Sequence, residues 1–250
     1  MYRIRIHFAK RHLLRRCLRD LWWGLMGRFA NSYSTQSLLR SWVNFECPIV
    51  NHPTQQHLLD AKLHNMRVAV ERLDGLIIEP DQIVSFWRFI GAPTESRGFV
   101  SGPTFEDGRV VSTFGGGLCQ ISGLLFNLAL ESGCEVIERH SHSLDAYGER
   151  RYLPLGRDAT VAWISKDLCF RNTTGVRLRL SVGVDRHRAF GRIEADAPME
   201  FKIKIDSEIS QENLDRKRIF VTTIQSISRR GSDWRKLRTF TSEYKTLTQN

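Results

Sequence analysis

Apolar residues recur at helical spacing near the start of the chain, inside a strongly basic segment. The stripe consists of Leu14, Leu18, Leu21, Leu25 and Phe29. Spacing of three and four residues predicts an amphipathic helix. Two interpretations of this helix stay open. It rests on an anionic membrane surface, or it packs on the rest of the protein with its arginines outward.

Two further helices are predicted from the same kind of pattern. The first covers residues 55–74, where Thr54 suits the start and Gly75 the end. Its apolar stripe is Leu59, Leu63, Met66, Val70 and Leu73. The second covers residues 118–131, after three glycines and before Gly133.

Short apolar runs separated by turn residues are typical of strands and fill most of the remaining chain. Residues 83–90 mix β-branched and aromatic side chains, and we expect a strand or a buried extended segment there. Asp107-Gly108 indicates a β-hairpin between residues 104–106 and 109–111. Further strands are expected at Glu135–Glu138, Ala159–Ile164, Arg177–Val184, Ala189–Ala195, Lys202–Asp206 and Arg218–Thr223.

This order of elements favours an α+β fold over a repeating βαβ pattern. We expect a single domain with N-terminal helices and a glycine-led central helix packed on a mainly antiparallel sheet. A basic amphipathic segment at 1–39 is expected before a domain at 40–225. A basic C-terminal tail is expected at 226–250.

The charge of the chain is concentrated at its two ends. The formal net charge is +10, yet residues 1–28 and residues 216–238 each hold eight Lys or Arg and one acid. The centre between them is mildly acidic and has no zinc-finger spacing and no RNP-like aromatic motif. We therefore expect no nucleic-acid partner. Basic ends suit peripheral contact with an anionic membrane, or serve only solubility.

Two features of the sequence bear on the cellular location of the protein. Arg15, Arg16, Arg19 and Asp20 interrupt the apolar run that a secretory signal would need. The five cysteines are odd in number and lack any CxxC spacing, which favours reduced thiols. These features predict a cytoplasmic protein, resting on the inner membrane face if the first helix binds lipid. We expect neither a cofactor nor a metal.

The segment with the most chemical content joins three glycines to a cysteine. Gly115, Gly116 and Gly117 lead into a helix whose first turn holds Cys119. The unpaired N–H groups and positive dipole end of a helix start favour a thiolate over a thiol. Backbone N–H groups near Gly117 and Leu118 would stabilise an oxyanion. The side chains that would bind oxyanion or substrate with them are Gln120 and Ser122.

A base and an orienting acid for Cys119 are available downstream. His140 or His142 is the candidate base, and Asp158 the candidate orienter. Cysteine hydrolases of the transglutaminase type arrange these groups in the same order. Arg139 and Arg157 are candidate ligand contacts. Three alternatives stay open, namely binding without chemistry, a zinc site using both histidines, and a purely structural role.

These segments, taken in order, resemble the VanW family. The similarity is carried by Asn65–Gly75, Ser85–Trp87, Gly115–Ser122, Glu138–His142, Gly156–Val161 and Asp167–Asn172. It covers roughly residues 40–200. The resemblance implies a link to glycopeptide resistance and to peptidoglycan or its precursors, so that a small peptide or cell-wall precursor is the expected partner. It leaves the molecular role open between acyl transfer or hydrolysis at Cys119 and a non-enzymatic accessory module at the membrane surface.

Overall fold

A computed structural model of the chain describes residues 2–50, 53–106, 109–213, 218–229 and 231–246. Its helices in these ranges are α1 (Tyr2–Leu25), α2 (Leu59–Glu71), α3 (Phe86–Ile90) and α4 (Leu118–Glu131). Single 3-10 turns lie at η1 (Pro53–Leu58), η2 (Glu95–Arg97) and η3 (Gly148–Arg150). The helices expected at 55–74 and 118–131 are therefore present, and the first of them begins as the 3-10 turn η1.

Two larger sheets form the framework. The five-stranded sheet is antiparallel throughout, in the order β1 (Ser32–Tyr33), β3 (Leu76–Ile78), β10 (Leu178–Val184), β11 (Arg188–Ala195), β2 (Arg40–Pro48). The four-stranded sheet has the order β12 (Phe201–Asn213), β13 (Arg218–Arg229), β14 (Arg235–Thr246), β8 (Leu144–Asp145). Its only parallel pair, within the described ranges, joins β14 to β8.

Two smaller sheets complete the described strands. One has the order β4 (Ile83–Ser85), β9 (Cys169–Arg171), β7 (Glu135–Glu138), and the other is the hairpin β5 (Ser101–Glu106) and β6 (Arg109–Phe114). The predicted hairpin is confirmed by the pairing of Glu106 with Arg109. The turn residues 107–108 themselves lie outside the described residues.

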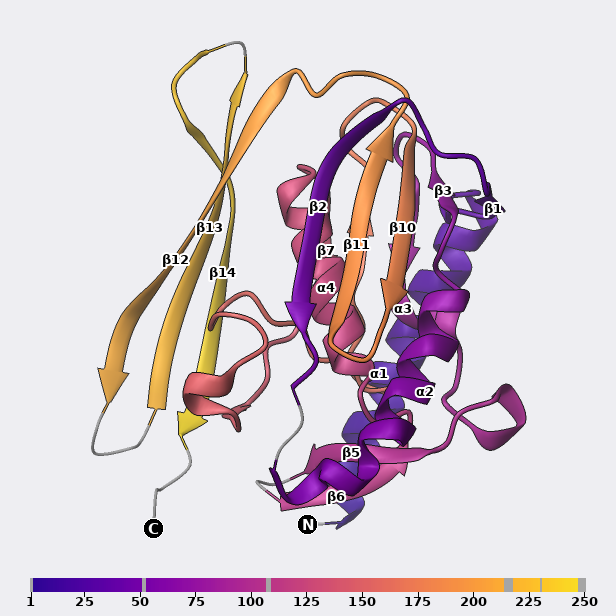
Figure 1. Cartoon of the computed structure of the whole chain (residues 1–250), viewed down its shortest axis with the longest axis vertical. Helices are drawn as coiled ribbons and strands as arrows, with labels where there is room; N and C mark the ends of the chain where they lie inside the picture. Colours follow the sequence, from indigo (N-terminus) through magenta and orange to yellow (C-terminus); the bar gives the residue numbers. More distant parts are fainter. Residues whose placement is uncertain (1, 51–52, 107–108, 214–217, 230, 247–250) are drawn as a thin grey trace.

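Helix α4 is the centre of the molecule. It lies between the five-stranded sheet and the four-stranded sheet (Figure 1), and it contacts β2 and β11 on one side and β12 on another. Such a helix has no solvent face, and the sequence of α4 accordingly lacks any charged residue before its last position, Glu131. Residues 120–130 of α4 are all buried. The expected α+β class, with a glycine-led helix packed on mainly antiparallel sheet, is confirmed.

Residues 83–90 differ from the extended segment expected. They form the strand β4 followed at once by the short helix α3, because the Ser85 hydroxyl accepts a hydrogen bond from the N–H of Arg88 at 3.3 Å and caps the helix. Here a local side-chain bond to the backbone outweighs the β propensity of the aromatic residues.

The strand expected at residues 159–164 was wrong. Only an isolated bridge from Ala162 to Lys166 lies there. The backbone groups of this segment form hydrogen bonds outside any sheet. The Ala159 carbonyl accepts from the Ser122 hydroxyl at 2.7 Å, and the Thr160 N–H donates to the His140 carbonyl at 2.8 Å. This irregular segment lies against the start of α4.

The C-terminal segment expected as a tail contains β14, and β13 runs through the boundary expected at residue 225. The expectation of a basic tail misses the strand pattern of this segment. Alternate residues of β14, namely Phe240, Ser242 and Tyr244, have side chains that are at least partly buried. The Phe240 ring packs edge-on against Phe126 of α4, with centroids 5.5 Å apart. The second sheet thus covers α4 with residues from this end of the chain.

We expect Gly116→Ala to destabilise the fold by about 2 kcal/mol, because an added methyl group would overpack a closed contact. A Cβ at Gly116 would lie 2.2 Å from the carbonyl carbon of Gly102 and 2.6 Å from the nitrogen of Pro103, both backbone atoms. Urea unfolding of the full chain measures the change in free energy.

Gly24→Ala is the matched control, because a Cβ at Gly24 of α1 meets nothing within 4 Å. It should leave the free energy of unfolding unchanged or slightly increased. Equal midpoints and slopes for the two variants would contradict the close packing at Gly116.

Candidate functional site

Cys119 opens into a large cavity. The cavity has a volume of about 990 Å³, and Cys119 lies in its wall at the start of α4. Aromatic side chains line much of the remainder, namely Trp87, Phe114, Tyr147, Tyr152, Trp163 and Tyr244. A large, mainly apolar pocket with few polar groups is typical of small-molecule and peptide sites.

The three glycines shape the backbone that brings Cys119 to this pocket. Gly115 and Gly117 have φ values of 80° and 103°, a left-handed region that disfavours other residues. Gly116 lies flat against Gly102 of β5. The turn therefore requires glycine at all three positions, and Gly115 and Gly117 line the pocket while Gly116 is buried beneath it.

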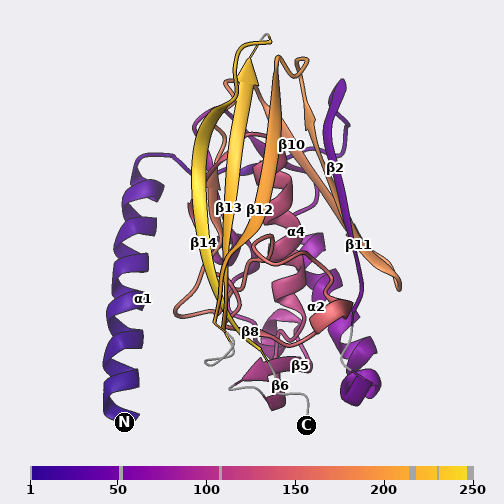
Figure 2. The same ribbon diagram turned by 90° about the vertical axis from the view of Figure 1, so that its left-hand side faces the viewer.

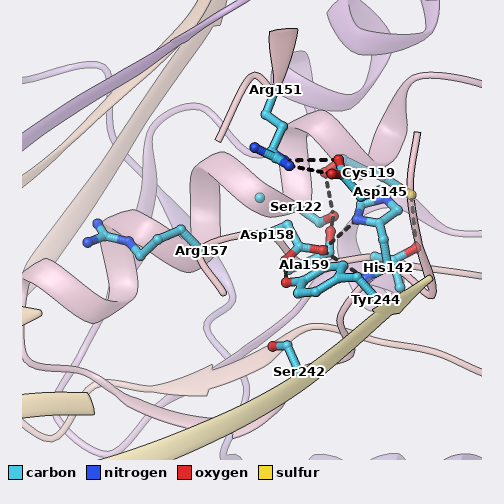
Figure 3. A network of polar contacts seen from close by, with 12 residues as sticks. Cys119, Ser122, His142, Asp145, Arg151, Arg157, Asp158, Ala159, Ser242 and Tyr244 are labelled. Carbon is cyan, nitrogen blue, oxygen red and sulfur yellow. Dashed lines mark hydrogen bonds and ion pairs between the residues drawn. The ribbon is translucent and has the colours of Figure 1, made fainter. Parts of the chain in front are cut away.

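His142 and Asp158 form a closely bonded pair beside Cys119. The Nδ1 atom of His142 lies 2.6 Å from Oδ2 of Asp158, and the His142 backbone N–H donates to the same oxygen at 2.7 Å. Because Nδ1 is engaged, the other ring nitrogen is left for the cysteine. Figure 3 shows the imidazole between the Asp158 carboxylate and the Cys119 sulfur.

Asp158 is held as a carboxylate by a second set of donors. Its Oδ1 accepts from the Arg139 guanidinium at 3.0 Å and from the Tyr244 hydroxyl. Burial alone would raise the pKa of Asp158, but the hydrogen bond and charge of His142 and the charge of Arg139 hold the pKa well below its ordinary value. The charge on Asp158 is therefore permanent at neutral pH.

The same network activates the thiol. Burial would raise the pKa of Cys119, but the hydrogen bond and charge of His142, followed by the Thr160 hydroxyl at 3.4 Å, lower it from 9.0 to about 7. Burial also opposes charge on His142, whose pKa is nevertheless raised by Asp158 and Cys119. The pair therefore favours thiolate and imidazolium near neutral pH.

His140 is turned away from Cys119. Strand β7 ends at Glu138, and the His140 Nε2 lies 3.0 Å from the Glu138 carboxylate. The zinc alternative needed both imidazoles on one side with Cys119, and the structure does not bring them together. Among the described residues, no group of three His, Cys, Asp or Glu side chains is arranged to hold a metal ion.

Three of the residues that the sequence suggested for an oxyanion or substrate, Leu118, Gln120 and Ser122, use their donors within the protein. The Leu118 N–H donates to the Gly115 carbonyl at 3.2 Å, and the Gln120 side-chain amide donates to the Pro48 carbonyl. Ser122 uses its hydroxyl to hold the Ala159 carbonyl. These three residues therefore support the start of α4.

Arg139 and Arg157 do not line the pocket. Arg139 lies beneath Asp158 and also donates to the Ser242 hydroxyl at 2.7 Å. Arg157 lies farther along α4 from Cys119 (Figure 3), where it bonds Asn127 and Glu131. Both arginines therefore act inside the protein rather than as ligand contacts.

Several pocket residues were not found by sequence reasoning. Lys62 of α2 lines the pocket with a side chain that is almost wholly buried, and burial lowers its pKa to about 8. Arg151 and Asp145 form an ion pair that also lines the pocket, with Nε and Oδ1 2.9 Å apart. Tyr152 lines the same cavity. The position of Lys62 on the apolar face of a predicted helix could have marked it as a pocket residue. The positions of Arg151, Asp145 and Tyr152 depend on loop conformation, which the sequence pattern does not indicate.

Fold and site together define a class of protein. It is an α+β protein in which a glycine-led helix presents a cysteine to a histidine–aspartate pair at the wall of a large pocket. A family model described as "VanW like protein" matches residues 61–193. The chain belongs to the VanW family.

Two relatives show how far this similarity extends. The Vancomycin B-type resistance protein VanW of Enterococcus faecalis (strain ATCC 700802 / V583) is 31% identical over 165 residues, which is 64% of this chain and 59% of that protein. The Uncharacterized protein YoaR of Bacillus subtilis (strain 168) is 33% identical over 112 residues, 45% of this chain and 36% of that protein. The chain thus spans less than two thirds of either relative. No solved structure matches it.

We expect iodoacetamide to alkylate Cys119 with a half-maximal rate near pH 7, because His142 lowers the pKa of that thiol to about 7. The exposed Cys17 is first replaced, as Cys17→Ser. Cys47 and Cys134 should stay unmodified near neutral pH, since burial raises the pKa of each to about 11. Mass spectrometry of peptides across a pH series measures each rate.

His142→Ala should move the midpoint of the pH dependence of Cys119 alkylation above 9.0. Burial, which raises the pKa of the thiol, is unchanged in this variant, whereas the imidazolium that lowers the pKa is lost. His140→Ala is the control and should leave the midpoint in place, since that side chain bonds Glu138. A midpoint that is the same in wild type and His142→Ala would show that the imidazole does not act on the thiol.

Tyr244→Phe should reduce the free energy of unfolding by about 2 kcal/mol, because two buried groups lose a partner. The Tyr244 hydroxyl donates to Asp158 and accepts from the Gly156 N–H at 2.8 Å. Tyr33→Phe is the control, as that hydroxyl makes an exposed bond to the Arg72 carbonyl. Chemical denaturation compares the two variants, and equal losses would exclude a special role for Tyr244.

Proposed function

We propose that this protein is a cysteine-dependent enzyme of acyl transfer or hydrolysis that acts on a peptide or amide. One observation carries the proposal. The Cys119 thiol lies at a helix start in a pocket wall, next to a histidine whose second nitrogen is held by a buried carboxylate 2.6 Å away. A cysteine with only a structural role needs no such relay.

The chemistry follows from the charge state of the pair. The Cys119 thiolate attacks the carbonyl carbon of the substrate, and a carbon–sulfur bond forms. The carbon–nitrogen bond then breaks as the His142 imidazolium gives its proton to the departing amine. A water or an acceptor amine next attacks the thioester and loses its proton to His142. The thiolate leaves and returns to its starting state.

The other residues have positioning roles in this scheme. Asp158 fixes the tautomer and orientation of His142, and Arg139 with Tyr244 fixes Asp158. The Thr160 hydroxyl, 3.4 Å from the sulfur, is a donor in the pocket wall for the developing oxyanion. Lys62, whose Nζ donates to the Val50 carbonyl, adds positive charge to the same wall. His140 has no part in the reaction.

A peptide of the cell-wall precursor type is the substrate class that we propose. Support comes from the name of the Enterococcus faecalis relative, which concerns vancomycin resistance, and from the size of the pocket. About 990 Å³ is the upper end of the range for small-molecule sites, enough for several amino-acid residues.

The proposal is tested with an activated ester, p-nitrophenyl acetate, on the full chain carrying Cys17→Ser. Wild-type protein should release a burst of nitrophenolate and gain one acetyl group on Cys119, seen by intact-mass and peptide mass spectrometry. His142→Ala should slow acylation by about a hundredfold or more, because the thiolate and the proton donor are both lost.

Two variants serve as controls, each checked for folding by circular dichroism. Cys119→Ser should lose the fast adduct, while His140→Ala should acylate within about twofold of wild type. The proposal fails if acylation of wild type is no faster than that of His142→Ala. It would then be replaced by a binding module in which the pocket acts without chemistry.

A further inference from the structure

Helix α1 presents an apolar stripe to the outside of the protein. The side chains of this α1 stripe are between 53% and 76% exposed. They are Leu14, Leu18, Leu21, Trp22, Leu25 and Met26. Their spacing places them along one side of the helix, so they form a continuous surface rather than isolated exposed residues.

The side of α1 that faces the protein is held by arginines. The Arg19 guanidinium bonds the Glu138 carboxylate and lies 3.4 Å from the buried Asp167 carboxylate. Arg16 donates to the Trp163 carbonyl, and its guanidinium lies 4.8 Å from the centre of the Trp163 ring. Figure 2 shows α1 running alongside the rest of the molecule.

This orientation is the reverse of that of an ordinary surface helix. A helix packed on a soluble domain buries its apolar stripe and turns its charges to water. Here Arg16 and Arg19 point inward and the leucines point outward, with Arg15 exposed beside them. Leaving six large apolar side chains in water is unfavourable, which implies that another surface covers them.

We propose that α1 is a docking helix that lays the α1 stripe into the interfacial layer of an anionic lipid bilayer. Residues 1–28 hold eight Lys or Arg and a single acid, which complements anionic headgroups. The same charge opposes a second copy of this chain as the occupant, since two such segments would repel each other. No described helix is both long and apolar enough to cross a membrane.

The docked helix would also place the pocket beside the bilayer. Trp163, which Arg16 contacts, is itself part of the pocket wall. Because the α1 stripe lies on the other side of α1 from this contact, the wall would lie one helix diameter, ~10 Å, from the bilayer surface. The docking inference stands on the exposed stripe and on the charge of residues 1–28, and it does not depend on any chemistry at Cys119.

The test is co-sedimentation of the full chain with two kinds of vesicle, one of phosphatidylcholine and one in which about a third of the lipid is phosphatidylglycerol. Wild-type protein should bind the anionic vesicles, weakly or not at all the neutral ones, and less as salt rises. Leu18→Glu with Leu21→Glu should weaken binding by about tenfold or more, because two inserting side chains become charged.

A control variant carries the same two Leu→Glu changes at positions outside α1. It separates the loss of side chains that insert into the bilayer from the effect of the added negative charge. Leu39→Glu with Leu237→Glu changes two exposed leucines away from α1 by the same amount. It should retain at least about a third of the wild-type affinity, as only net charge changes. Size-exclusion chromatography of each variant reports its oligomeric state and its folding.

Two results would overturn the proposal. The first is equal binding of anionic vesicles by the Leu18/Leu21 variant and by wild type. The second is no vesicle binding by wild type together with a dimer that the same variant dissociates, which would assign the α1 stripe to a second copy. Neither result bears on acylation of Cys119, so failure here leaves the proposed function separately testable.

Discussion

The burial of α4 between two sheets is the constraint on which the rest of this structure depends. A helix without a solvent face is mainly apolar on all sides. The unpaired backbone groups at its two ends must therefore reach solvent or polar partners. The N-terminal end emerges at the pocket, where Gly117 ends the preceding turn with a left-handed φ of 103°. Cys119 thus takes its position from the packing of the residues behind it.

A second layer of organisation is electrostatic. Asp158 collects hydrogen bonds from His142, Arg139 and Tyr244, which come from two separated parts of the chain, the segment after β7 and the strand β14. An almost buried carboxylate is costly unless donors satisfy it, and these donors do so. The consequence is a fixed negative charge behind the imidazole, which in turn favours the thiolate. Tyr244 lies outside residues 61–193, so the second sheet supports the site from beyond the family match.

Helix α1 is related to the pocket through its arginines. Arg19 links Glu138 and Asp167. Burial would raise the pKa of Glu138, but its hydrogen bond with His140 and the charge of Arg19 lower that pKa to about 2. The arginines that a sequence would assign to water therefore hold the helix on the protein. The apolar side is left outward as a result, while Arg16 on the inward side contacts Trp163 of the pocket wall.

The sequence by itself determined the elements whose pattern is local. These include the helices around residues 59–71 and 118–131, the hairpin at β5 and β6, and the strands β7, β10 and β11. The sequence also grouped Cys119 with Asp158 and with His140 or His142 as one candidate set. Periodicity, glycine position and turn chemistry act over a few residues and can be read directly.

Only the tertiary structure decided what depends on distant parts of the chain. It separated His142 from His140, because β7 ends at Glu138 and the chain then turns toward Asp158. It engaged Gln120 and Arg157 inside the protein, and it turned the leucines of α1 outward. In each case the outcome depends on which partner lies across the fold, and a linear pattern does not contain that information.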